Sequence, residues 1–156
     1  MNRLALLALV GTIALASCNM NKAPDVTGTT KSVAFTAQLN STAGSGYTGA
    51  AGTAKFVDLT GGDRRTTLTA TGLKPGVNYI AHFHARGAAA PASTGDCASG
   101  GAVVGGMIGG DTLFTAAADG TLTIKGFQST ADLSSAAYIN IHEKAAASVI
   151  PLCADI

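Results

Sequence analysis

The sequence predicts an all-β protein, either a β-sandwich or a Greek-key barrel of seven or eight short strands. Short runs of alternating apolar and polar residues recur along the chain, and turns rich in Gly, Pro and Asp separate them. No stretch shows the period of a long amphipathic helix. The 20 glycines and the small share of aromatic residues suit short strands joined by tight turns.

The first 17 residues are expected to be a secretion signal. Arg3 precedes an apolar run, residues 4–14, that is too short to span a bilayer comfortably. The run ends at Leu15-Ala16-Ser17-Cys18, which resembles a bacterial lipobox and implies cleavage before Cys18 and lipid on its sulfur. The alternative is a plain secretory signal that is cut nearby, with Cys18 incidental. We therefore expect an exported protein of the cell envelope, at the periplasmic or the outer surface.

The remaining chain is the size of one domain. Residues 18–31 are expected to form a lipidated N-terminus and flexible tether, and residues 32–156 a single β domain. With 10 Lys and Arg against 9 Asp and Glu, charge is sparse and nearly balanced, so a nucleic-acid partner is not expected. The sequence makes no prediction about the oligomeric state.

Turns set the order of the expected strands. Gly61-Gly62-Asp63 and Gly72-Leu73-Lys74-Pro75-Gly76 are turn signals, and Ala118-Asp119-Gly120 predicts a hairpin. The longest irregular segment, residues 88–112, is expected to be functional, because long loops in small domains usually are. The strands are expected at residues 32–40, 52–59, 66–71, 79–87, 112–116, 121–125, 138–142 and 149–153.

Two of the three histidines lie two residues apart in one of these strands. Alternation places His82 and His84 on one face, with backbones about 6–7 Å apart, a span that two imidazoles can close around a metal ion. The third, His142, lies in a second β-prone run. The alternative is an ordinary polar sheet surface.

The cysteines fit an oxidising compartment. With Cys18 set aside, Cys97 and Cys153 remain as an even pair. A bridge would close a loop of about 57 residues and contribute roughly 4 kcal/mol. Two buried free thiols are the alternative.

Six pieces in register resemble the copper/zinc superoxide dismutase family, over residues 32–156. They are the Gly72–Gly76 turn before the His-x-His strand, Gly95-Asp96-Cys97, the Gly105–Asp111 segment, Ala118-Asp119-Gly120-Thr121, Ile139-Asn140-Ile141-His142, and Cys153 near the C-terminus. The resemblance implies a Greek-key β-barrel of that family's type and a disulfide between Cys97 and Cys153. It also implies one copper ion held by His82, His84 and His142, with superoxide as the substrate.

Several family features are missing from this chain. The fourth copper histidine, which bridges to zinc, and the two further zinc histidines have no counterpart, so we expect copper without zinc. Met107 falls near a zinc histidine position, and Asp111 near the zinc carboxylate. The family arginine before the last cysteine is replaced by Ile150, and only ten residues separate His142 from Cys153.

Three other residues are candidates for roles near the copper. Arg86 and Lys144 lie within two residues of proposed ligands and are candidates to attract the anion; the alternative is an ordinary solvated charge for each. Met107 is a candidate soft ligand, because a thioether favours Cu(I); otherwise it fills space in the loop.

Two functions of different classes follow. The first is a lipid-anchored copper superoxide dismutase, and the second is a copper lipoprotein that stores or delivers the ion without catalysis. A metal-free relative acting through its surface is a weaker third. A hydrolytic three-histidine zinc site is disfavoured, because Glu143 is the one general base beside it and alternation points it away from His142.

Overall fold

The computed structural model describes residues 28–38, 46–47, 49–89 and 91–156. The expected signal segment, Cys18 and the first part of the tether lie outside the described residues. Among the described residues, no helix has the length and apolar character needed to cross a membrane.

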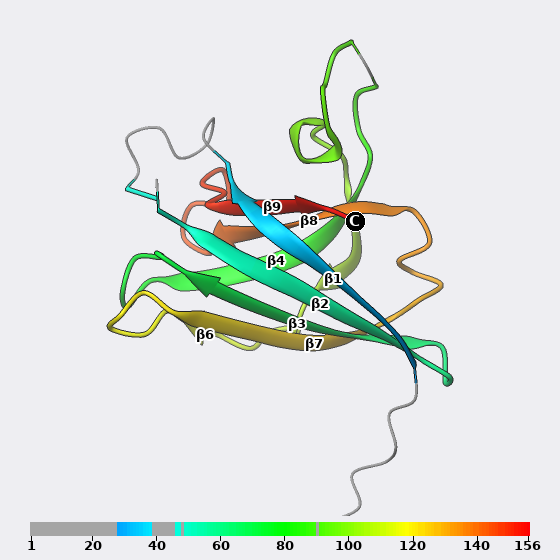
Figure 1. Cartoon of the computed structure of the whole chain (residues 1–156), viewed down its shortest axis with the longest axis horizontal. Coiled ribbons are helices and arrows are strands. Elements are labelled where there is room, and N and C mark those ends of the chain that lie inside the picture. Colours follow the sequence, from blue (N-terminus) through cyan, green and yellow to red (C-terminus); the bar gives the residue numbers. More distant parts are fainter. Residues whose placement is uncertain (1–27, 39–45, 48, 90) are drawn as a thin grey trace, which may run out of the picture.

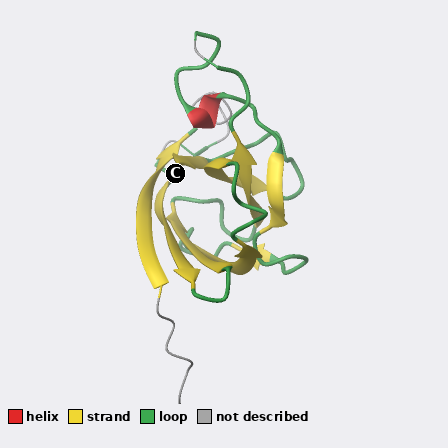
Figure 2. Cartoon of the chain, turned by 90° about the vertical axis from the view of Figure 1, so that its right-hand side faces the viewer, coloured by secondary structure: helices red, strands yellow, loops and turns green. Residues whose placement is uncertain are grey.

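The described residues fold into a nearly closed antiparallel β-barrel (Figures 1 and 2), which confirms the predicted all-β class. The hydrogen-bonded order is β5-β4-β8-β9-β1-β2-β3-β7, with β6 also paired to β4. Strand β4 therefore follows β3 in sequence but lies across the barrel from it, as in a Greek key. The strands are β1 (Gly28–Ala37), β2 (Ala51–Leu59), β3 (Asp63–Thr71), β4 (Asn78–Ala85), β5 (Val103–Met107), β6 (Phe114–Thr115), β7 (Leu122–Ser129), β8 (Ala136–Glu143) and β9 (Leu152–Asp155), with one 3-10 turn, η1 (Asp96–Ala98).

Apolar side chains from alternate strand positions fill the barrel interior. In β4 the residues that point inward, among them Ala81 and Phe83, are fully buried, and their neighbours in β8, Ile139 and Ile141, are buried as well. These residues belong to one apolar cluster, whose larger members also include Phe35, Phe56, Leu68, Ile124 and Leu152. Burial of this face fixes the register of β4 against β8, and thereby decides which residues point outward.

A buried side chain spans the gap between β5 and β7, the two ends of the strand order. Gln128 on β7 donates from Nε2 to the carbonyl oxygens of Gly105 and Gly106 on β5, at 2.7 and 3.0 Å. Both glycines have positive φ, 67° and 69°, a conformation that other residues rarely adopt. The β5 backbone thus turns its carbonyls toward Gln128.

Three details differ from the sequence prediction. Strand β1 begins at Gly28 rather than residue 32, so part of the expected tether pairs with β2. The segment expected to be irregular, residues 88–112, contains β5. The predicted hairpin does not form as a strand pair: β6 pairs with Asn78 and Tyr79 of β4 and not with β7. The tight turn before β7 does form.

Candidate metal centre

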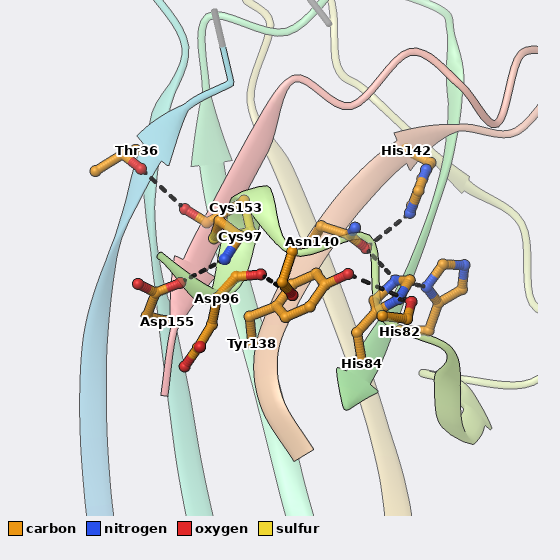
Figure 3. Close-up of a disulfide and its surroundings, with 12 residues drawn as sticks. Thr36, His82, His84, Asp96, Cys97, Tyr138, Asn140, His142, Cys153 and Asp155 are labelled. Atoms are coloured by element: carbon orange, nitrogen blue, oxygen red, sulfur yellow. Dashed lines mark hydrogen bonds between the residues drawn. A yellow bond between two sulfur atoms is a disulfide. The ribbon is translucent and has the colours of Figure 1, made fainter. Parts of the chain in front are cut away.

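All three histidines meet on the outer face of β4 and β8. These strands are antiparallel neighbours, with Ile80 opposite His142 and His82 opposite Asn140. Because alternate residues share a face, His82, His84 and His142 project from the same side of the sheet (Figure 3). One nitrogen from each ring lies within 4.8 Å of the others. The structure therefore brings the three sequence-predicted ligands together.

The cluster lies on an outer face and is nevertheless largely covered. His84 and His142 are 7% and 6% exposed, while His82 is only partly buried. The Tyr138 ring stacks on His84, with centroids 4.6 Å apart and planes 8° from parallel. His82 therefore marks the side of the cluster that solvent reaches.

Backbone carbonyls fix two of the rings. His84 Nδ1 lies 2.8 Å from the Gly101 carbonyl oxygen, and His142 Nδ1 lies 2.5 Å from that of Ala147. A carbonyl only accepts, so each ring donates from Nδ1, and in the neutral ring Nε2 keeps a free lone pair. This support by a second contact is typical of histidines that bind metals.

Burial also favours the neutral rings. It lowers the pKa of His82 to about 4, and charge on His142 and His84 adds to the effect. Burial likewise lowers the pKa of His142, although its hydrogen bond to Ala147 acts in the opposite direction. Since a metal binds the unprotonated nitrogen, His82 and His142 are available as ligands near neutral pH.

The spacing of the donors is close to what one ion requires. Nitrogen ligands lie about 2.0–2.1 Å from zinc, with similar values expected for copper, so two of them on one ion are roughly 2.9–3.4 Å apart at angles of 90–110°. His82 Nδ1 and His84 Nε2 lie 2.9 Å apart. The full set spans 4.8 Å, slightly wider than one ion allows, so a small ring movement must accompany binding. Imidazole suits copper and zinc alike, and the cluster does not identify the metal.

The predicted disulfide is confirmed and stands beside this cluster (Figure 3). Cys97 in η1 is bonded to Cys153 in β9, with Cα atoms 6.0 Å apart, and Cys153 lies opposite Asn140 in the β8–β9 register. Cys97 also donates from its backbone N–H to Asp155, at 2.8 Å. These contacts hold the loop that supplies the Gly101 carbonyl to His84.

Two predicted anion-attracting residues lie in different settings. Arg86, just beyond the end of β4, forms an ion pair with Asp96 of η1, which neutralises part of its field. Lys144 is exposed, and its backbone N–H donates to the Asn78 carbonyl at 2.8 Å. The adjacent Glu143 points away from the histidines, as predicted, and accepts hydrogen bonds from Tyr47 and Lys74.

Met107 lies beside the cluster. It occupies the last position of β5, directly opposite His82 in register, and is 39% exposed. Residues opposite each other in a ladder share a face, so its side chain is on the histidine side. Its role as a ligand stays a prediction. Asp111 is exposed and does not belong to the metal-compatible group found among the described residues.

Sequence reasoning did not identify Asn140. This residue is 3% exposed and its side-chain oxygen contacts two of the histidines. The available signal was its position two residues before His142, which places both on one strand face. The carbonyls of Gly101 and Ala147 were also missed, because backbone groups leave no mark in a sequence.

No family model matches the chain, and no curated protein matches it.

Proposed function

We propose that the protein is a copper-dependent superoxide dismutase of the cell envelope, anchored to a membrane by lipid on Cys18. The observation that carries the proposal is the set of three imidazoles, two of them held by backbone carbonyls, on one face of an antiparallel β-barrel. The resemblance of residues 32–156 to copper/zinc superoxide dismutases supports copper as the ion and superoxide as the substrate.

The reaction balances with one copper ion. Two superoxide anions and two protons give one dioxygen and one hydrogen peroxide. A copper ion held by His82, His84 and His142 would supply the one-electron chemistry, because copper has two accessible oxidation states. The chain has only three histidines, so no further imidazole is present to deliver protons, and both protons come from water.

The residues of this chain hold the site and limit access to it. Gly101 and Ala147 keep the Nε2 atoms of His84 and His142 directed into the cluster. Tyr138 covers His84, whereas the partly exposed His82 leaves a way in for a small anion. Such fixed donors need little reorganisation when the charge of the ion changes.

The second candidate is a copper-binding protein without fast catalysis. The observation that favours it is the Arg86–Asp96 ion pair, together with Ile150 at the position of the family arginine. Both reduce the positive field that would attract superoxide, and such steering changes encounter rates by about 10–10³-fold. Copper would then be stored or passed on from the same three histidines.

The test is superoxide dismutation by the purified protein loaded with one equivalent of copper. We expect activity in the wild-type protein and its loss in His84→Ala, because removal of a ligand should weaken copper binding by more than the roughly 10–100-fold seen for supporting residues. Tyr47→Phe is the matched control. It removes a buried hydroxyl that contacts Tyr79 of β4 and Glu143 of β8 on the face opposite the histidines.

Each outcome has a distinct meaning. Activity that survives in Tyr47→Phe and disappears in His84→Ala supports the dismutase. Tight copper binding with activity no higher than in His84→Ala would replace it with the copper-binding candidate. Failure of the wild-type protein to bind copper would overturn both functions.

A further inference from the structure

Asn140 places its side-chain oxygen among the nitrogen donors of the histidine cluster. Its Oδ1 lies 2.7 Å from His142 Nε2 and 3.1 Å from His84 Nε2. The residue is 3% exposed, and it stands opposite His82 in the β4–β8 register. Figure 3 shows its side chain directed toward the three rings.

When the His142 ring is neutral, its contact with the Asn140 oxygen has no proton. His142 already donates from Nδ1 to Ala147, so Nε2 of the neutral ring is an acceptor. The amide oxygen is also an acceptor, and 2.7 Å is too close for two acceptors with nothing between them. His84 Nε2 can take a proton from His82 Nδ1, 2.9 Å away, but His142 Nε2 has no such donor within the described contacts of the cluster. A cation at this place would satisfy all of these lone pairs.

Three separations in the cluster are close to those of ligands around one ion. Donors at about 2.0–2.2 Å from a metal lie roughly 2.8–3.5 Å from each other at angles near 90–110°. Three separations in this cluster, 2.7, 2.9 and 3.1 Å, fall in or next to that range. They connect four atoms: His82 Nδ1, His84 Nε2, Asn140 Oδ1 and His142 Nε2.

The opposite orientation of the Asn140 amide, with its nitrogen facing the rings, is incompatible with a bound ion. If the side chain turned by 180°, Nδ2 would donate to His142 Nε2 and occupy the lone pair that an ion needs. With an ion bound to that nitrogen, the amide hydrogens would point at a positive charge. Copper binding therefore requires the oxygen to face the ion.

We propose that the Asn140 side-chain oxygen is a fourth ligand of the ion and that it favours Cu(II) over Cu(I). An amide oxygen is a hard donor, which suits the more highly charged ion, whereas Cu(I) prefers softer ligands and fewer of them. This inference rests on the proposed copper site, but it does not depend on dismutase activity.

The experiment measures the dissociation constants of Cu(II) and Cu(I) by chelator competition, together with the electron paramagnetic resonance spectrum of the Cu(II) form. Asn140→Leu keeps the approximate shape and removes the oxygen. We expect its Cu(II) affinity to fall by about 100-fold or more with little change for Cu(I), which raises the reduction potential by about 118 mV or more. Its spectrum should also differ from that of the wild-type protein.

Two further variants complete the comparison. Asn140→Asp keeps an oxygen and adds a negative charge, so we expect a change of the affinity ratio in the opposite direction, toward Cu(II). Asn78→Leu is the matched control, because Asn78 is an amide on β4, the strand that carries His82 and His84, and it contacts Thr115 rather than a histidine. It should leave both constants unchanged.

The outcomes separate this inference from the proposed function. Equal changes in Cu(II) and Cu(I) affinity in Asn140→Leu would show that the amide only supports the His142 ring, and would overturn the inference. If Asn140→Leu does not fold, a wild-type affinity ratio in Asn140→Asp overturns it. A shifted ratio in a protein without dismutase activity supports the fourth ligand and overturns the dismutase alone.

Discussion

Two clusters of polar side chains lie on opposite faces of β4 and β8, and they differ in how hydrogen-bond donors match acceptors. On the inner face, the Lys74 N–H donates to Tyr79, Tyr79 and Tyr47 share a hydrogen bond of 2.7 Å, and Tyr47 donates to Glu143. Lys74 Nζ also donates to Glu143, at 2.8 Å. On the outer face, the contact between His142 Nε2 and Asn140 Oδ1 has no proton when the ring is neutral.

This difference separates a structural cluster from a binding site. The inner cluster contains the protons it needs, and Glu143 has a lowered pKa because Lys74 and then Tyr47 donate to it. Burial, followed by the contacts with Glu143 and Tyr79, raises the pKa of Tyr47. Such a cluster is complete without a ligand. The outer cluster has more acceptors than donors, so a cation completes it.

The largest effect should come from the disulfide, which is near the outer cluster only. Cys97→Ala with Cys153→Ala should lower the free energy of unfolding by about 4 kcal/mol, because the bridge closes a long loop. Copper affinity should fall as well, since the loop carries the Gly101 carbonyl that holds His84. Urea unfolding of the metal-free protein and copper competition measure the two effects.

The chemically reduced wild-type protein is the control for the cysteine substitutions. It should resemble the double variant in both measurements. An unchanged copper affinity together with a large loss of stability would show that the strands alone hold the histidine site.

The second effect is a pH dependence that belongs to the outer cluster. His82 has a pKa of about 4 in the folded metal-free protein, against about 6.5 in an unfolded chain. Between these values the unfolded chain binds more protons, so stability is full above pH 6.5 and decreases as the pH falls toward 4. The loss should be on the order of 2 kcal/mol, after allowance for the partial exposure of His82.

Urea unfolding of the metal-free protein between pH 7.5 and 4 measures this loss. His82→Ala, which has no ring to titrate at this position, should show a flatter profile. A wild-type profile equal to that of His82→Ala would contradict the assignment of the pH dependence to this ring.

A smaller effect is expected when one tyrosine hydroxyl is removed from each face. Tyr47→Phe should cost about 1–2 kcal/mol, because it breaks hydrogen bonds of a buried group, and should leave copper affinity unchanged. Tyr138→Phe should cost less. The contact it removes, from the hydroxyl to the Gly101 oxygen, is long at 3.4 Å, and the ring of the variant can still stack on His84. Thermal unfolding compares the pair. A larger loss of stability in Tyr138→Phe than in Tyr47→Phe would contradict the conclusion that the inner cluster is the one whose hydrogen bonds are complete.

The sequence predicted what depends on local alternation. The His-x-His spacing placed His82 and His84 on one face. Glu143 points away from His142 for this reason too. The even pair of cysteines predicted the bridge.

What the sequence did not predict depends on contacts between distant segments. Strand β5 has two glycines with positive φ within five residues, so its sequence has the composition of a loop; its pairing with β4 makes it a strand. Asn140 is one polar residue in an apolar run, and only its distances to His84 and His142 reveal a role. Such information appears when β4 and β8 are placed side by side.

The smallest expected effect concerns Met107, and it tests how far the outer cluster extends. Met107 lies opposite His82 but is 39% exposed, whereas Asn140 is buried and already contacts two rings. If the amide oxygen completes the site, the thioether is not required. Met107→Leu, which keeps the volume, should therefore leave Cu(I) affinity and the reduction potential unchanged. A loss of Cu(I) affinity of tenfold or more would instead make Met107 a soft ligand of the reduced ion, and the outer cluster would then bind its two oxidation states with different fourth donors.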